Sequence, residues 1–355
     1  MTIEASGKVL DEWQKTQLYD ATNTPNHGTA DGEVFDIAIV GAGPVGLYGA
    51  YYAGFRGRRV VVIDSLSVVG GQVAALYPEK KIYDVAGFPE VLGRDLIDGL
   101  YQQALRYDPT FLLGESVVSR SYDDSIRVHT FVTASGRRVN ARAALISGGV
   151  GTFSPKPLPA ARNYLGEGLS YFVPDPSQLQ ATDVVVVGGG DSAIDYALML
   201  SDIAKSVTLV HRRSEFRAHE ASVKELYASS VEVITDAEVT ALIGSDHLEK
   251  VEISRSGEVL YRSCDHVIAA LGFNANVASI RALGLDVVDN RHIQVSTRME
   301  TNIEGIYAAG DIATYDGKVK LIAVGFGEAA TAINNAVVAI DPKEHLAPGH
   351  SSDNT

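Results

Sequence analysis

The chain has little cysteine: its 355 residues contain one, Cys264. A single cysteine excludes an intrachain disulfide, a C-x-x-C redox pair and a zinc cluster, and we predict no metal site. Basic residues are also in deficit, with 30 Lys and Arg against 44 Asp and Glu. The net charge of −14 argues against a nucleic-acid partner and mainly favours solubility.

Long apolar runs are missing as well. None approaches the length of a bilayer span, and the N-terminus lacks the basic start and apolar core of a secretion signal. We therefore expect no membrane partner and a cytoplasmic location. The length favours two domains of ordinary globular composition. Residues 1–33 are polar and rich in turn formers, which predicts a flexible N-terminal extension.

The stretch from Phe35 to Asp64 has the complete pattern of a dinucleotide site. A buried strand is followed by G-x-G-x-x-G at Gly41, Gly43 and Gly46, then by a helix and a second strand that ends in Asp64. The glycines allow a tight turn, close approach to a pyrophosphate and close helix packing, and the acid can bind ribose hydroxyls. An ordinary glycine turn is the alternative, but it does not predict the order of the other parts.

A second unit repeats the pattern from Asp183. Here G-x-G-x-x-A follows the first strand, and the next strand ends in cations instead of an acid. Cations at this position suit the 2′-phosphate of NADP, whereas a solvated turn is the alternative. The predicted NADP-binding residues are Gly189, Gly190, Asp191, Ser192, Ala193, His211, Arg212, Arg213 and Arg217.

Other segments predict the surrounding elements. Residues 68–84 form a loop in which Gly71 and Gln72 can approach a ligand, and a Gly-Asp pair at 310–311 follows a buried strand. A linker is predicted at 152–158. The predicted helices are 92–107 and 321–338, and the predicted strands are 116–122, 126–133, 138–142, 143–151 and 267–271.

These patterns predict an α/β protein with two Rossmann-like, three-layer ββα dinucleotide-binding domains, the second inserted into the first. The first dinucleotide-binding domain would comprise residues 34–157 and 287–355, and the inserted second one, with the cations that suit NADP, residues 158–286.

The motifs together resemble the two-dinucleotide flavoprotein disulfide reductases. GGQVAALYPEKKIYDVAGFP, GGGDSAIDYALML, HRRSEFRAHE and TNIEGIYAAGDI are similar to the bacterial thioredoxin-reductase-like ferredoxin–NADP reductases, from about Phe35 to Ser352. The resemblance implies a homodimer in which hydride passes between NADP(H) and flavin N5 of FAD, and single electrons pass to a ferredoxin bound transiently by electrostatic attraction. It implies no catalytic acid, base or nucleophile.

The resemblance also assigns residues. Tyr77 would stack on one face of the flavin and His350, from the partner subunit, on the other; an ordinary core tyrosine is the alternative for Tyr77. Two departures are the extension at 1–33 and Asp64, where many relatives have Glu. The implied FAD-binding residues are Gly41, Gly43, Pro44, Gly46, Asp64, Gly71, Gln72, Tyr77, Val117, Phe153, Asp311 and Ser352.

The cysteine count decides between branches of the family. Thioredoxin reductases carry C-x-x-C before the second glycine motif, and this chain has Ser170 to Ser177 there without cysteine. Dithiol chemistry is therefore excluded. The alternatives that remain are a flavin reductase with another acceptor, such as flavodoxin, a quinone or oxygen, and a non-catalytic NADP sensor.

Candidate cations for docking a ferredoxin are Lys80, Lys81, Arg56, Arg58 and Arg59.

Overall fold

The structure is a computed structural model that describes residues 32–149, 152–160, 164, 167–171, 173, 176–276, 278–347 and 349. These residues divide into two compact units. Ser154–Asn274 form the smaller unit, and the segments before and after it form the larger one. The chain passes from one unit to the other within β9 (Thr152–Pro155) and β18 (Phe273–Asn276). The segment predicted as a linker at 152–158 therefore begins as a strand.

The larger unit is built on five parallel strands in the order β5-β2-β1-β8-β21. Their register is level at the carboxyl ends, because Val40 pairs with both Ile63 and Ile146, and Ala308 pairs with Ile146. The turns that follow these strands consequently gather at one edge of the sheet, where open α/β sheets bind ligands. The strands are β1 (Val34–Val40), β2 (Val60–Asp64), β5 (Thr110–Leu113), β8 (Arg138–Ile146) and β21 (Ile306–Ala308).

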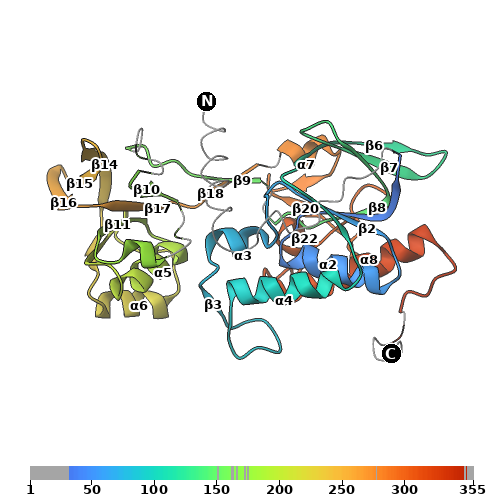
Figure 1. Cartoon of the computed structure of the whole chain (residues 1–355), viewed down its shortest axis with the longest axis horizontal. Helices are drawn as coiled ribbons and strands as arrows, with labels where there is room; N and C mark the ends of the chain where they lie inside the picture. The colour runs from blue at the N-terminus through green and yellow to red at the C-terminus, as the bar shows by residue number, and fades with distance from the viewer. Residues whose placement is uncertain are drawn as a thin grey trace. The chain divides into compact units, whose positions relative to one another are not determined.

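Three helices lie together along one face of this sheet: α2 (Pro44–Phe55), α4 (Gly93–Leu105) and α8 (Ile322–Ile340) (Figure 1). The predicted helices at 92–107 and 321–338 correspond to α4 and α8. By length and composition alone, α8 could cross a membrane. Its buried residues, among them Ala329, Ala332 and Ile333, instead belong to the core that includes α2 and β8.

The strand β8 has different partners along its two halves within one seven-stranded sheet. On one side it pairs parallel with β1 from Asn140 to Ile146. On the other side its first half pairs antiparallel with β7 (Val128–Thr133), which pairs with β6 (Val117–Asp123), and its second half pairs parallel with β21. We predicted separate strands at 138–142 and 143–151, and that division is wrong. Exposed and buried side chains alternate up to Arg142, and every side chain from Ala143 to Ile146 is buried. The pattern changes where β21 replaces β7 as the neighbour of β8, and the parallel part of the sheet is covered on both faces.

Shorter elements complete the larger unit. The predicted loop at 68–84 contains a short helix, α3 (Gly71–Leu76). Helix α7 (Ala278–Ala282) packs on β6, so it belongs to the larger unit although it precedes the predicted boundary at residue 287. The remaining elements are β3 (Lys81–Ile82), β4 (Val91–Leu92), β19 (Val287–Val288), β20 (His292–Gln294), the 3₁₀ turn η2 (Gly310–Ile312) and β22 (Ala313–Thr314).

The smaller unit has three layers. Its parallel sheet, in the order β10-β17-β11-β12-β13, buries side chains on both faces. Val184 and Val186 pack with the helices α5 and α6, and Val185 and Val187 pack with the antiparallel sheet β14-β15-β16. The elements are β10 (Leu169–Ser170), η1 (Pro176–Leu179), β11 (Asp183–Gly188), α5 (Asp191–Ser201), β12 (Ser206–Val210), α6 (Glu220–Ala228), β13 (Glu232–Ile234), β14 (Ala237–Gly244), β15 (Leu248–Arg255), β16 (Glu258–Ser263) and β17 (His266–Ala270).

This ββα arrangement confirms the predicted α/β fold class. β11, α5, β12 and β17 correspond to elements predicted from the sequence, whereas β14, β15 and β16, which form the second β layer of the predicted ββα arrangement, were not predicted individually. That layer contacts the parallel sheet through Val239, Val251 and Ile253, which are all buried.

Candidate nucleotide and flavin sites

The first glycine turn joins β1 to α2 at the carboxyl edge of the sheet. Gly41 has a φ of +114°, and a Cβ atom there would lie 2.7 Å from the amide nitrogen of Gly148. A Cβ atom on Gly46 would lie 1.8 Å from the carbonyl oxygen of Gly41. Neither position accepts a side chain. Pro44 is the first residue of α2, where its missing N–H costs no helical hydrogen bond.

Asp64 ends β2 beside this turn. Its Oδ2 accepts the N–H of Ala42 at 2.6 Å, and its Oδ1 accepts the N–H of Leu66 at 2.8 Å. Burial raises the pKa of Asp64, and the two backbone hydrogen bonds oppose that shift. Each carboxylate oxygen retains a lone pair that can accept from a ribose hydroxyl.

Two further backbone segments close around the turn. A Cβ atom on Gly71, whose φ is +55°, would lie 3.0 Å from the Cα of Gly43. The amide group of Gln72 lies against Gly149, 2.7 Å from where a Cβ atom would stand. Gly43 itself is open, since a Cβ atom there would meet nothing nearer than 4.0 Å. This open glycine stands at the N-terminus of a 12-residue helix, a position where backbone N–H groups are available to an anion.

Tyr77 and Asp311 share one electrostatic environment. Tyr77 ends α3, and burial raises its pKa to about 12, with a further contribution from the charge of Asp311. Asp311 is exposed in η2, next to Gly310, whose φ is +78°. The structure thus brings the predicted flavin-stacking residue and the predicted acid into the same part of the larger unit.

The remaining predicted FAD-binding residues are only partly within the described part of the structure. Val117 is buried at the start of β6, two residues after Glu115, whose N–H donates to the carbonyl of Asp64. The backbone of Phe153 lies in β9, and its side chain is outside the described part of the structure. His350 and Ser352 lie outside the described residues altogether.

The second glycine turn joins β11 to α5. Ala193 is fully buried, and a Cβ atom on Gly188 would lie 2.8 Å from the Cβ of Ala193, so the helix starts close to the strand. Gly190 precedes the helix, Asp191 begins it, and Ser192 is exposed in its first turn. The N–H of Arg217 donates to the carbonyl of Gly189 at 2.7 Å, which brings the segment after β12 back to the turn.

His211 and the arginines after it have different surroundings. The His211 ring is buried against Gly189, where a Cβ atom would lie 2.0 Å from its Cε1, and it stacks on Phe216 at 5.1 Å. Burial lowers the pKa of His211. Arg212, Arg213 and Arg217 are exposed, and none of them forms an ion pair with another described residue. Arg217 lies next to the second glycine turn through its backbone, and Arg212 and Arg213 directly follow His211, which packs against that turn.

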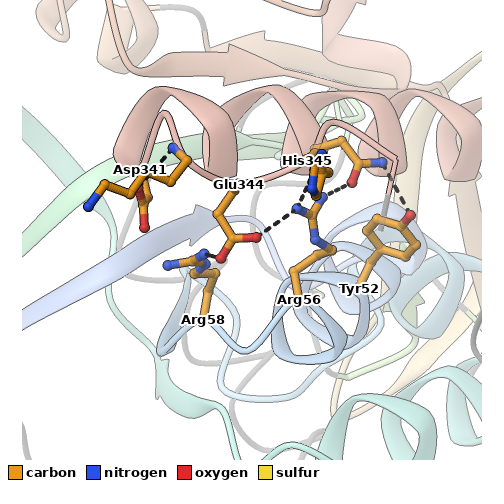
Figure 2. A network of polar contacts seen from close by, with 8 residues as sticks. Tyr52, Arg56, Arg58, Asp341, Glu344 and His345 are labelled. Carbon is orange, nitrogen blue, oxygen red and sulfur yellow. Dashed lines mark hydrogen bonds and ion pairs between the residues drawn. The ribbon is translucent and has the colours of Figure 1, made fainter. Parts of the chain in front are cut away.

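The predicted docking cations are mostly engaged within the chain. Figure 2 shows Arg56 and Arg58 turned toward Glu344 and His345, which follow α8. Arg56 is buried and is not available to a partner, so that prediction is wrong for it. Arg59 pairs with Glu33 and Lys81 with Glu90, and both arrangements leave the side chains on the surface.

Sequence analysis missed Glu328. It is the only charged residue in the 19 residues of α8, and it is buried there. A lone acid in an apolar helix was the signal that could have identified it, because such a group needs buried partners.

Cys264 is also buried, and burial raises the pKa of its thiol to about 12, which keeps it from acting as a thiolate.

Comparison with known proteins identifies the family of the chain. A ferredoxin–NADP reductase of Nocardioides sp. is 52% identical over 320 residues, covering 90% of this chain and 97% of that protein. One of Frankia casuarinae is 53% identical over 319 residues, covering 89% and 98%. The crystal structure of T. acidophilum thioredoxin reductase matches with a TM-score of 0.73 and 26% identity, covering 87% and 99%. Residues 35–341 match the family described as pyridine nucleotide-disulphide oxidoreductases, and the chain belongs to this family.

Proposed function

We propose that this oxidoreductase transfers electrons between NADPH and ferredoxin through a bound FAD. The observation that carries the proposal is the contrast between its two glycine turns. The first is followed by a strand that ends in Asp64, and the second by a strand that ends beside Arg212 and Arg213. An acid suits an unphosphorylated ribose and guanidinium groups suit a 2′-phosphate, so the two units select different nucleotides.

The larger unit fits FAD. The open backbone at Gly43 and the first turn of α2 would hold the pyrophosphate, and Asp64 would bind the adenosine ribose. Gly71 and Gln72 would cover the pyrophosphate from the second loop. When bound, FAD supplies the exchange of electron pairs with a nicotinamide and of single electrons with an iron–sulfur protein.

The flavin end of the site would be formed by Tyr77 and Asp311. An aromatic ring against one face holds a flavin flat and shields it from water. Asp311 would accept hydrogen bonds from the ribityl chain, and Val117 and Phe153 would contact the remainder of FAD. His350, supplied by the partner subunit of a homodimer, would cover the opposite face and would move when nicotinamide enters, and Ser352 would also contact FAD.

The smaller unit fits NADP(H). The N-terminus of α5, from Gly190 to Ala193, would receive its pyrophosphate. The side chain of Asp191, which accepts the N–H of His219, would reduce the space for it there. Arg212, Arg213 and Arg217 would bind the 2′-phosphate. His211 holds the turn by packing under Gly189, and its contribution to NADP binding is this support.

Ferredoxin is proposed as the electron acceptor because of the names of the relatives and because the chain lacks a second cysteine. The relatives are named as reductases of ferredoxin. The one cysteine is buried and unreactive, so a thiol cannot relay electrons to a disulfide. We propose a cytoplasmic enzyme that binds ferredoxin transiently, using exposed cations such as Lys80 and Lys81, with no membrane or nucleic-acid partner.

One assay tests the function as a whole. Purified holoprotein is mixed anaerobically with NADPH and, in parallel reactions, with ferredoxin, flavodoxin, thioredoxin or a quinone. We expect the fastest turnover with ferredoxin and none with thioredoxin. Turnover with flavodoxin or quinone alone would assign a different acceptor to the same flavoprotein. A colourless protein that binds no FAD would contradict the proposal.

A further inference from the structure

The carboxylate of Glu328 lies in the core of the larger unit and accepts three hydrogen bonds. Its Oε2 accepts the backbone N–H of Gly310 at 2.8 Å. Its Oε1 accepts the hydroxyl of Tyr315 at 2.7 Å and a bond from the ammonium group of Lys318. We call these three side chains and the Gly310 amide the Glu328 network.

The ion pair in the network is buried, whereas Tyr315 is partly exposed. The side chains of Glu328 and Lys318 are 4% and 6% exposed. Burial, together with the hydrogen bond to Glu328, raises the pKa of Tyr315 to about 12. Buried ion pairs add little net stability compared with apolar residues of similar volume, because desolvation offsets their attraction. A function beyond stability is therefore a reasonable explanation for keeping a charged pair here.

The fixed point of the network is the backbone just before Asp311. Gly310 has a φ of +78°, a conformation that side chains disfavour. Val45 packs against it from α2, since a Cβ atom on Gly310 would lie 3.2 Å from Val45 Cγ2. The same methyl group would lie 2.5 Å from a Cβ atom on Gly325, in the first turn of α8. The first turns of α2 and α8 thus contact η2 at this point. The hydrogen bond between Gly310 and Glu328 sets the direction of the backbone that leads into Asp311.

We infer that Glu328 is a positioning residue for FAD: it fixes the backbone of Gly310 so that the carboxylate of Asp311 is held where the ribityl chain binds. Tyr315 and Lys318 hold Glu328 in turn. The inference rests on the proposed FAD site and adds to it three residues that do not touch the cofactor. A group held in place before binding lowers the entropy lost on binding, so the network raises the affinity for FAD.

The test compares FAD binding to the apoprotein of several variants by the quenching of flavin fluorescence. Glu328→Ala is expected to weaken binding by roughly tenfold or more, since a hydrogen bond to a charged group is lost. Glu328→Gln retains an acceptor for the Gly310 N–H but turns an amide NH₂ group toward Tyr315 and Lys318, so it should restore only part of the affinity. Tyr315→Phe, which leaves the ion pair intact, should weaken binding only a few-fold. Asn335→Ala is the control, because Asn335 is buried in the same helix and its side chain donates to the carbonyl of Thr331, away from the network.

A double-mutant cycle separates positioning from a general loss of stability. If Glu328 acts through Asp311, Glu328→Ala should have little effect on FAD affinity in an Asp311→Ala background. Equal losses with and without Asp311, or a Glu328→Ala apoprotein that binds FAD as well as the Asn335 control, would overturn the inference. Wild-type apoprotein that binds no FAD would instead overturn the proposed function.

Discussion

The Oδ2 atom of Asp64 lies 2.6 Å from the amide nitrogen of Ala42, so the acid at the end of β2 is tied to the first glycine turn. Ala42 lies between the two glycines that shape the turn. Asp64 therefore has two roles in the proposed site: it holds the turn in shape, and it offers its remaining lone pairs to a ribose.

Replacing Asp64 should weaken FAD binding through both roles. We expect Asp64→Asn to raise the FAD dissociation constant by about tenfold and Asp64→Ala to raise it further, because an amide supplies one acceptor in place of two. Fluorescence titration of apoprotein measures this. Asp36→Asn is a matched control, since Asp36 accepts the N–H of Arg59 at the opposite end of the sheet. Equal losses in both variants would indicate a general effect on folding.

Coenzyme choice should depend on two exposed guanidinium groups. Charge-assisted hydrogen bonds contribute about 1.5–3 kcal/mol each, so replacing Arg212 and Arg213 by Ala should raise the KM for NADPH by tens of fold or more. The KM for NADH should change little. Steady-state assays with both coenzymes provide the measurement. Arg255→Ala is the control, because Arg255 is an exposed residue at the end of β15 in the same unit. A similar loss with NADPH and NADH would exclude these arginines as the 2′-phosphate site.

The sequence predicted both nucleotide units because their turns are determined locally. At Gly41 and Gly46 a Cβ atom would collide with the backbone, so these glycines are obligatory and visible in the sequence. The division of β8 was wrong because its burial pattern changes within one strand, where its neighbour on one side changes from β7 to β21. Short-range periodicity describes the faces of a strand and does not show that the chain continues without a turn.

Partners distant in the sequence could not be predicted. Arg56 looks like one of several surface cations, yet its hydrogen bond to the carbonyl of His345 joins residues 289 positions apart. His211 lies in a cationic run and is buried beneath Gly189. Glu328 bonds the amide of a residue 18 positions earlier, in another element. In each case tertiary contacts decide the role, and local composition indicates only that a polar group is present.

Docking of ferredoxin should depend on ionic strength. The chain is acidic overall, so attraction to an acidic partner requires local cations such as Lys80 and Lys81. Reduction of ferredoxin should slow as salt rises from low to physiological concentration, whereas reduction of a small neutral dye should change less. Stopped-flow measurements at several salt concentrations test this. A ferredoxin rate that is independent of salt would contradict electrostatic docking.

Acid should destabilise the larger unit through His129. Its ring is buried in β7, where Nδ1 lies 3.0 Å from Nη1 of Arg120 and so accepts a hydrogen bond from it. Burial, and next the charge of Arg120, lowers the pKa of His129 from 6.5 to about 4, while a bond to the carbonyl of Glu304 opposes the shift. The unfolded chain therefore binds a proton at a higher pH than the folded one.

The contribution of His129 to stability should be complete above about pH 6.5 and should decline as the pH falls toward about 4. Urea titrations at a series of pH values measure it. His129→Gln, which can still accept from Arg120, should remove this part of the pH dependence while other groups keep theirs. Identical pH profiles for the two proteins would show that His129 is protonated to the same extent in both states.

The segment that follows α8 should be held in place by Arg56. Its Nη2 donates to the carbonyl of His345 at 2.7 Å, its Nη1 donates to Asn334, and Glu344 lies 3.6 Å away as an ion-pair partner (Figure 2). Arg58 binds the same Glu344. Because the Arg56 side chain is only 3% exposed, its removal would leave the carbonyl of His345 and the side-chain oxygen of Asn334 without this donor. Glu344 would keep Arg58 as its partner.

We expect Arg56→Met to lower the free energy of unfolding by about 2–4 kcal/mol and Arg56→Lys to lower it by less, since one ammonium group cannot reach all three acceptors. Hydrogen exchange of residues 341–347 should quicken more than that of β1, because the lost contacts are local. Arg94→Met is the matched control: Arg94 binds Glu79 at 2.6 Å in the same unit but is 41% exposed, so it should cost less than about 1 kcal/mol. If exchange after α8 is as slow in Arg56→Met as in the Arg94 control, the segment is held by its other contacts and Arg56 is not its anchor.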